Sequence, residues 1–136
     1  MSSWTTVCGL ADVPRDGAVA VLIDGEQVAV VRLADDTLFA VGHRDPVGGA
    51  NVMARGLVGS TTVDGVEVPT IASPMFKQVY DLRDGRCLTD RQTVLATWDV
   101  RLHDGDVQVG PARLAPGSAI DADDQTESEV ATHERR

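Results

Sequence analysis

Four Asp-Gly pairs lie between runs of strand-forming residues and limit the folds open to this chain. They are Asp24-Gly25, Asp64-Gly65, Asp84-Gly85 and Asp104-Gly105. A type I′ turn needs a positive φ at both central residues, and Asp-Gly adopts this conformation more easily than most pairs. Each pair therefore predicts a tight antiparallel hairpin.

The expected strands are short, and no apolar pattern is long enough for a helix of three turns. The strands are expected at residues 4–7, 17–23, 26–33, 37–41, 57–63, 66–71, 78–82, 86–88, 97–102 and 106–109. A single helical turn is expected at 52–55, capped by Asn51 and ended by Gly56. Short strands separated by turn signals are typical of an antiparallel β-sandwich or small barrel. The predicted fold class is all-β with little helix.

The chain divides into a folded part and an acidic tail. From Pro111 onward the strand pattern stops, and residues 117–136 carry six carboxylate side chains against two arginines. Such a stretch buries too little apolar surface to offset the entropy lost on ordering. We predict one β domain over residues 1–110 and a disordered tail over 111–136. Docking of the tail on a partner is the alternative.

The charge of the chain excludes two classes of partner. Its net charge is −9 with a pI near 4.6, whereas nucleic acids and anionic membranes require clustered lysines and arginines. The N-terminus does not resemble a signal peptide, and no apolar run approaches the length of a membrane span. A cytoplasmic location is expected, with Cys8 and Cys87 as reduced thiols.

Two loops with a proline near the tip lie between expected strands. The first, residues 41–47, reads Val-Gly-His-Arg-Asp-Pro-Val, and the second, residues 71–77, reads Ile-Ala-Ser-Pro-Met-Phe-Lys. These loops and the strands around them resemble the Rieske family. In Rieske proteins a Cys-x-His loop and a Cys-x-x-His loop together hold a [2Fe–2S] cluster. The resemblance covers residues 4–110 and implies a Rieske-like antiparallel β-sandwich.

All four ligand positions implied by this resemblance hold other residues. Asp45 and Ser73 stand at the cysteine positions, and Val47 and Phe76 stand at the histidine positions. Valine and phenylalanine have no donor atom, and a carboxylate with a hydroxyl does not replace two soft thiolates. The remaining candidate ligands, which are Cys87 and the three histidines, are too few or too scattered to form a metal site. Surface positions are expected for the histidines, which are His43, His103 and His133. We therefore expect no catalytic residue, cofactor or metal site in this chain.

A Rieske-like domain without these ligands resembles the small subunit of the assimilatory NAD(P)H-dependent nitrite reductase. The segments that carry this resemblance are Asp45-Pro46, Arg55-Gly56-Leu57, 72–78, 84–88 and 100–109. The resemblance implies an accessory, non-catalytic subunit of a complex that reduces nitrite to ammonium. It implies a large catalytic subunit as the partner. FAD, a [4Fe–4S] cluster, sirohaem and the NAD(P)H site are implied on that large subunit.

Loops without a cluster have two compatible uses. In one, Val47 and Phe76 plug the gap between the loops. In the other, Arg44, Met75, Phe76 and Lys77 form part of the interface with the large subunit, because apolar and basic residues on loop tips suit a partner.

Two other functions stay open. One is a cluster-bearing Rieske-type ferredoxin or electron-transfer component of an oxygenase or reductase. The other is a free-standing module that binds a small ligand. Nucleophilic catalysis and nucleotide binding are not expected, since the chain has neither a triad at motif spacing nor a glycine-rich phosphate loop. The chain itself therefore does not distinguish NADH from NADPH.

Overall fold

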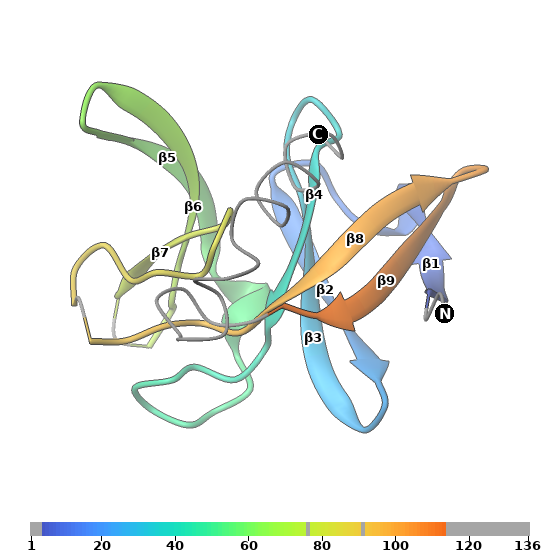
Figure 1. The fold of residues 1–136 in the computed structure, drawn as a ribbon, viewed down its shortest axis with the longest axis horizontal. Helices are drawn as coiled ribbons and strands as arrows, with labels where there is room; N and C mark the ends of the chain where they lie inside the picture. The colour runs from blue at the N-terminus through green and yellow to red at the C-terminus, as the bar shows by residue number, and fades with distance from the viewer. Residues whose placement is uncertain (1–3, 76, 91, 114–136) are drawn as a thin grey trace, which may run out of the picture.

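Two antiparallel sheets make up the computed structural model, which describes residues 4–75, 77–90 and 92–113 (Figure 1). The larger sheet has the strand order β1-β9-β8-β4-β3-β2, and the smaller has the order β5-β6-β7. The strands are β1 (Thr5–Gly9), β2 (Gly17–Ile23), β3 (Glu26–Arg32), β4 (Leu38–Gly42), β5 (Leu57–Val63), β6 (Val66–Ala72), β7 (Val79–Asp81), β8 (Thr97–His103) and β9 (Asp106–Ala112).

Helical structure in the described residues is limited to two 3₁₀ turns, η1 (Leu10–Asp12) and η2 (Met53–Arg55). The predicted all-β class is therefore confirmed. No helix in this part of the chain is long and apolar enough to cross a membrane.

Three of the four Asp-Gly pairs form the predicted hairpin turns. Both residues have positive φ at Asp24-Gly25 (49° and 83°), Asp64-Gly65 (52° and 81°) and Asp104-Gly105 (52° and 82°). These turns connect β2 to β3, β5 to β6 and β8 to β9. The residues flanking each turn pair directly, as a two-residue connection requires.

The prediction for Asp84-Gly85 is wrong. Of this pair, Gly85 has a positive φ, and the chain turns over a wider loop in which Asp81 N donates to Arg86 O at 2.8 Å. Arg83 stabilises this wider loop, because its backbone N (2.8 Å) and its guanidinium (Nε 3.0 Å) donate to the Asp81 carboxylate. The expected strand at 86–88 is reduced to two isolated bridges, Arg86 with Val94 and Cys87 with Tyr80.

The cap of η2 and the end of β9 also differ from the expectation. Val52 rather than Asn51 caps η2, while Gly56 ends it as predicted. Strand β9 continues to Ala112, past the predicted domain boundary at residue 110, because Ala112 pairs with Trp98. Of the predicted tail, residues 114–136 lie outside the described residues.

Strand β3 is buried on both faces and separates two hydrophobic clusters. Alternate residues of a strand point to opposite faces. Val28 and Val30 accordingly pack in the cluster of the larger sheet, with Val107 and Val109 among its members. Ala29 and Val31 pack in a second cluster, which contains Phe39, Val41, Met53, Ile71, Tyr80, Leu82, Cys87 and Leu95. The second cluster joins the two sheets and supports both proline loops.

Candidate functional site

The first proline loop follows β4 and is held by its own backbone. Asp45 N donates to Ala50 O at 2.8 Å, and Gly49 N donates to Asp45 O at 2.7 Å. Gly49 has a φ of +80°, a conformation that glycine adopts readily. The loop is therefore a closed turn that fixes the backbone of Asp45.

The second proline loop connects β6 to β7 and closes around Ser73. Ser73 N donates to Gln78 O at 2.9 Å, and Lys77 N donates to Ser73 O at 3.0 Å. Met75 N donates to Ser73 Oγ at 3.2 Å. These bonds aim the Ser73 hydroxyl and leave its proton for an acceptor outside the loop.

That acceptor is Asp45. Ser73 Oγ donates to Asp45 Oδ2, while Asp45 Oδ1 accepts from Val47 N at 2.8 Å and from Gly48 N at 3.3 Å. Both side chains are buried, with Asp45 fully covered and Ser73 only 2% exposed. Hydrogen bonds to an ionised carboxylate are stronger than those between neutral groups. The two loops, one from each sheet, are thus joined directly at Asp45 and Ser73, which are predicted from the sequence to stand at the Rieske cysteine positions.

His43 supports the first loop through hydrogen bonds. Its side chain is buried, so the predicted surface position of this residue is wrong. Its Nδ1 accepts from Ala54 N at 3.0 Å, and its carbonyl accepts from Val52 N and Met53 N. Burial lowers the pKa of His43, and the positive charge of Arg55 adds to this effect. A neutral imidazole that accepts at Nδ1 serves here as a structural group.

Of the other candidate ligands, His103 is exposed and its Nε2 lies 3.4 Å from the Asp104 carboxylate. His133 lies outside the described residues. Cys87 is buried, with Sγ 3.3 Å from Thr89 Oγ1, and it is a free thiol, as is Cys8. Burial, followed by the nearby charges of Asp12 and Asp106, raises the pKa of Cys8.

The donor atoms at the two loops do not fit a Rieske-type [2Fe–2S] cluster, which takes two thiolates and two imidazoles. Asp45 uses both oxygens in hydrogen bonds inside the protein. Val47 offers no donor atom and is 45% exposed, so it does not plug a gap between the loops. Phe76 lies outside the described residues. Within those residues, no group of three or more His, Cys, Asp or Glu side chains is placed to share a metal ion.

Three of the predicted interface residues can be placed. Arg44, Met75 and Lys77 are exposed on the joined loops, Met75 to 50%. The Arg44 guanidinium lies over the first loop, since a Cβ on Gly49 would be 3.3 Å from its Nη2. The loop tips therefore present basic and apolar groups to solvent.

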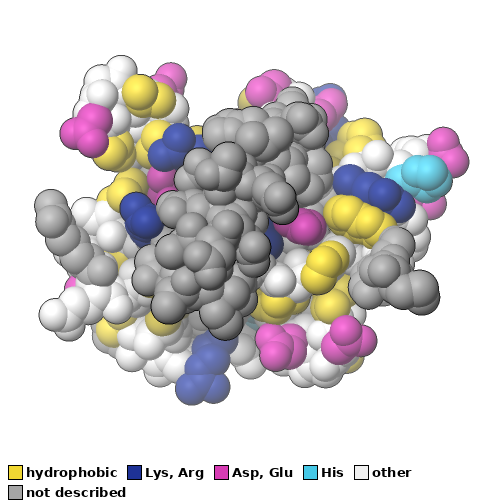
Figure 2. Space-filling view, viewed as in Figure 1, with side chains coloured by type: hydrophobic (Ala, Val, Ile, Leu, Met, Phe, Trp, Pro, Cys, Tyr) yellow, Lys and Arg dark blue, Asp and Glu magenta, His cyan; other side chains and the backbone are white. Residues whose placement is uncertain are grey.

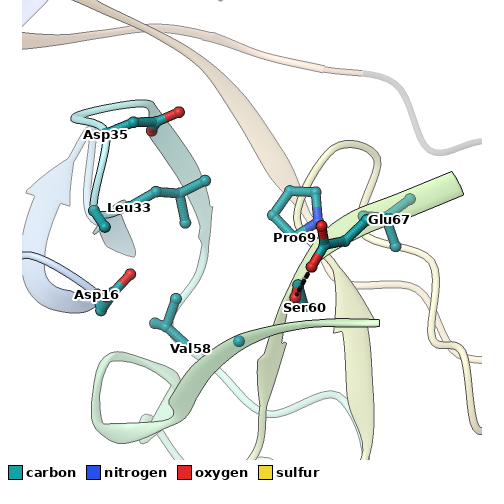
Figure 3. Close-up of a pocket in the computed structure, with 10 residues that line it drawn as sticks. Asp16, Leu33, Asp35, Val58, Ser60, Glu67 and Pro69 are labelled. Atoms are coloured by element: carbon teal, nitrogen blue, oxygen red, sulfur yellow. Dashed lines mark hydrogen bonds between the residues drawn. The ribbon is translucent and has the colours of Figure 1, made fainter. Parts of the chain in front are cut away.

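A groove that the sequence did not reveal lies between the β5–β6 hairpin and the turn between β3 and β4 (Figure 3). Its volume is about 660 Å³, and its lining residues are Asp16, Leu33, Ala34, Asp35, Val58, Gly59, Ser60, Glu67, Val68 and Pro69. Segments far apart in the chain form it, so no local motif predicts it. Near the groove, Figure 2 shows hydrophobic and acidic side chains together at the tip of this hairpin, at the upper left.

Comparison with known proteins identifies the family. Residues 3–110 match the model of the Rieske-like [2Fe-2S] domain. The nitrite reductase (NADH) small subunit of Salmonella typhimurium is 36% identical over 110 residues, which are 80% of this chain and 98% of that protein. The solution structure of the nitrite reductase [NAD(P)H] small subunit from Erwinia carotovora has a TM-score of 0.67 at 36% identity. The match covers 84% of this chain and 85% of the Erwinia carotovora chain.

A third relative is a larger protein. The nitrite reductase [NAD(P)H] large subunit of Klebsiella oxytoca is 32% identical over 111 residues, which are 82% of this chain but 11% of that protein. The predicted Rieske-like fold is thus confirmed. With its Rieske-like domain, this chain belongs to the family of the NAD(P)H-dependent nitrite reductase small subunits.

Proposed function

We propose that this chain is an accessory, cluster-free subunit, and that the large subunit of the complex carries out the reduction of nitrite to ammonium. The observation behind this proposal is the hydrogen bond from Ser73 to Asp45. Each of these residues stands at a Rieske cysteine position, and each satisfies the side chain of the other. A loop pair closed in this way has no thiolate to offer to iron.

The partner is a large subunit of nitrite reductase. The Klebsiella oxytoca large subunit supports this choice, because a segment of its own polypeptide is similar to this chain. A domain that occurs both as a small subunit and inside a large one is expected to act beside the same catalytic machinery. The redox groups implied for that machinery are FAD, a [4Fe–4S] cluster and sirohaem, all on the large subunit.

The joined loops are the docking surface for the large subunit. Arg44 and Lys77 are basic groups on an acidic chain, and Met75 is a half-exposed apolar group on the second loop. Phe76 belongs to the same segment by sequence. Because the Asp45–Ser73 hydrogen bond fixes the loops before binding, little conformational entropy is lost on docking.

Co-expression with a large subunit tests this function. We expect the two chains to purify together, and nitrite-dependent oxidation of NAD(P)H by the large subunit to change when this chain is omitted. Failure of the chains to associate at any salt concentration contradicts the proposal.

The alternative is a cluster-bearing electron carrier, which the description of the matching family model favours. It predicts a red-brown protein with iron and acid-labile sulfide in the amounts of one [2Fe–2S] cluster. A colourless, iron-free protein after anaerobic purification excludes it.

A further inference from the structure

The groove beside the β5–β6 hairpin takes no part in the joined loops. Its floor is apolar, because Leu33 and Val58 pack with their inner faces against the cluster that joins the two sheets. Ala34 and Pro69 add further apolar groups to the lining of the groove. The floor therefore suits the aliphatic part of a side chain.

Carboxylates surround this floor. Asp16 and Asp35 lie on one side of the groove and Glu67 lies on the other (Figure 3). Thr37 N donates to Asp35 Oδ1 at 3.0 Å, and hydrogen bonding to Thr37 lowers the pKa of Asp35. Ser60 Oγ donates to Glu67 Oε2 at 2.7 Å. None of the residues that line the groove is a lysine or arginine. The nearest arginines in sequence, Arg15 and Arg32, form ion pairs with Asp36, which does not line the groove.

The wall of the groove is also an unusual edge strand. Among the described strands, β5 pairs with β6 and has no neighbour on its other side. Its seven residues, Leu-Val-Gly-Ser-Thr-Thr-Val, include no charge and no proline, the groups that commonly protect an edge. Leu57 and Val66 on this hairpin are 77% and 55% exposed. An extended partner segment is therefore the occupant that suits both the groove and its wall.

Charge distinguishes between the candidates for this segment. Residues 117–136 of the chain itself have a net charge of −4, and a second copy of the chain carries −9. Like charges across a contact are unfavourable. The carboxylates of Asp16, Asp35 and Glu67 form the rim of the groove. A segment with lysine or arginine complements the charge of this rim, and the aliphatic stem of either side chain can pack on the apolar floor.

We propose that the groove holds an extended, lysine- or arginine-bearing segment of the large subunit, as a second contact besides the joined loops. This inference rests on the proposed function, because it takes the large subunit as the partner. Two contacts on one chain strengthen binding beyond either alone.

Binding of the full chain to purified large subunit tests the proposal. The variant D16N/D35N/E67Q removes three charges from the rim, and asparagine tolerates the positive φ of Asp16. The matched control D24N/E26Q/D104N removes three exposed charges elsewhere and also includes two positive-φ positions. We expect the Kd of the rim variant to rise about tenfold and that of the control by less than about twofold.

Ala34→Trp separates seating in the groove from long-range attraction, because it fills the groove without changing charge. We expect a similar loss of affinity. Circular dichroism of each variant checks the fold.

If the wild-type chain does not bind, the proposed function fails and the inference fails with it. If the wild type binds and the rim variant behaves like its control, the inference alone is overturned. If the rim variant weakens binding to the large subunit but Ala34→Trp does not, the partner segment does not lie in the groove, and the inference is overturned. If the variants instead change the self-association of the chain, measured by sedimentation, while binding to the large subunit is unchanged, the groove is assigned to a second copy of the chain. That result would also overturn the proposal.

Discussion

Ser73 Oγ donates a hydrogen bond to Asp45 Oδ2, and this single contact joins the loop after β4 to the loop between β6 and β7. The two residues are separated by 28 positions in the chain and both are buried. Rieske proteins hold a [2Fe–2S] cluster between two loops. In this chain a carboxylate and a hydroxyl provide the bridge.

Removing the Ser73 hydroxyl is expected to destabilise the protein. In Ser73→Ala the buried Asp45 carboxylate loses one hydrogen bond, and an unsatisfied buried polar group costs about 1–3 kcal/mol. Urea denaturation measures the change in free energy of unfolding. Ser60→Ala is the control, because its hydroxyl bonds Glu67 on the surface and its loss is expected to cost less than about 0.5 kcal/mol. Equal values for the two variants contradict the bridging role.

The stability of the protein is expected to fall as the pH drops below the ordinary His43 pKa of 6.5. Because the pKa of His43 is lowered in the folded protein, the unfolded chain binds the proton more readily. Acid therefore stabilises the unfolded state relative to the folded state. Above this pH the effect vanishes.

His43→Asn keeps an acceptor near the Nδ1 position and removes the titration. Its free energy of unfolding should therefore depend less on pH between 7 and 5 than that of the wild type. If the free energy of unfolding of His43→Asn depends on pH as steeply as that of the wild type, His43 is not the source of this pH dependence.

Two glycines with the same backbone conformation should respond differently to alanine. Gly85 and Gly105 have φ values of +83° and +82°, so an alanine at either is strained by about 1–2 kcal/mol. At Gly85 the added Cβ would also lie 2.0 Å from Leu95 O, whereas at Gly105 it meets nothing within 4 Å. We expect Gly85→Ala to be less stable than Gly105→Ala by about a further 1–3 kcal/mol in thermal or urea unfolding. Similar stabilities would show that the close approach at Gly85 is absent.

Charge reversal on the joined loops should weaken binding to the large subunit. Arg44→Glu with Lys77→Glu replaces two exposed cations on the proposed docking surface, and a loss of about tenfold in affinity is expected. Arg86→Glu with Arg101→Glu makes the same change in charge outside the loops and should bind more nearly like the wild type. Co-purification and titration both measure the effect. Equal losses from the two pairs place the docking surface elsewhere.

Local signals explain why so much of the fold is predictable. Asp24-Gly25, Asp64-Gly65 and Asp104-Gly105 specify their own turns, and the valine-rich runs beside them specify strands. Asp84-Gly85 departs from the rule, and the wider loop around it is stabilised by Arg83, which donates to the Asp81 carboxylate in the preceding strand. That interaction depends on side chains outside the turn motif.

The site was only partly predictable. The resemblance to Rieske loops predicts that Asp45 and Ser73 stand at the cysteine positions, but as possible metal ligands these residues suggest only the absence of a cluster. The sequence did carry a signal for their hydrogen bond, because a carboxylate and a hydroxyl stand at two positions that are expected to lie close together. Burial of His43 and the groove beside β5 depend on tertiary packing, for which the sequence carries no local pattern.

The most direct test of the account is the iron and acid-labile sulfide content of this chain, purified anaerobically as part of its complex and then separated from the large subunit. We predict neither iron nor sulfide in the separated chain and no visible absorption, while the complex retains nitrite-dependent oxidation of NAD(P)H. Iron and sulfide in the amounts of one [2Fe–2S] cluster, with the visible bands of such a cluster, would contradict it.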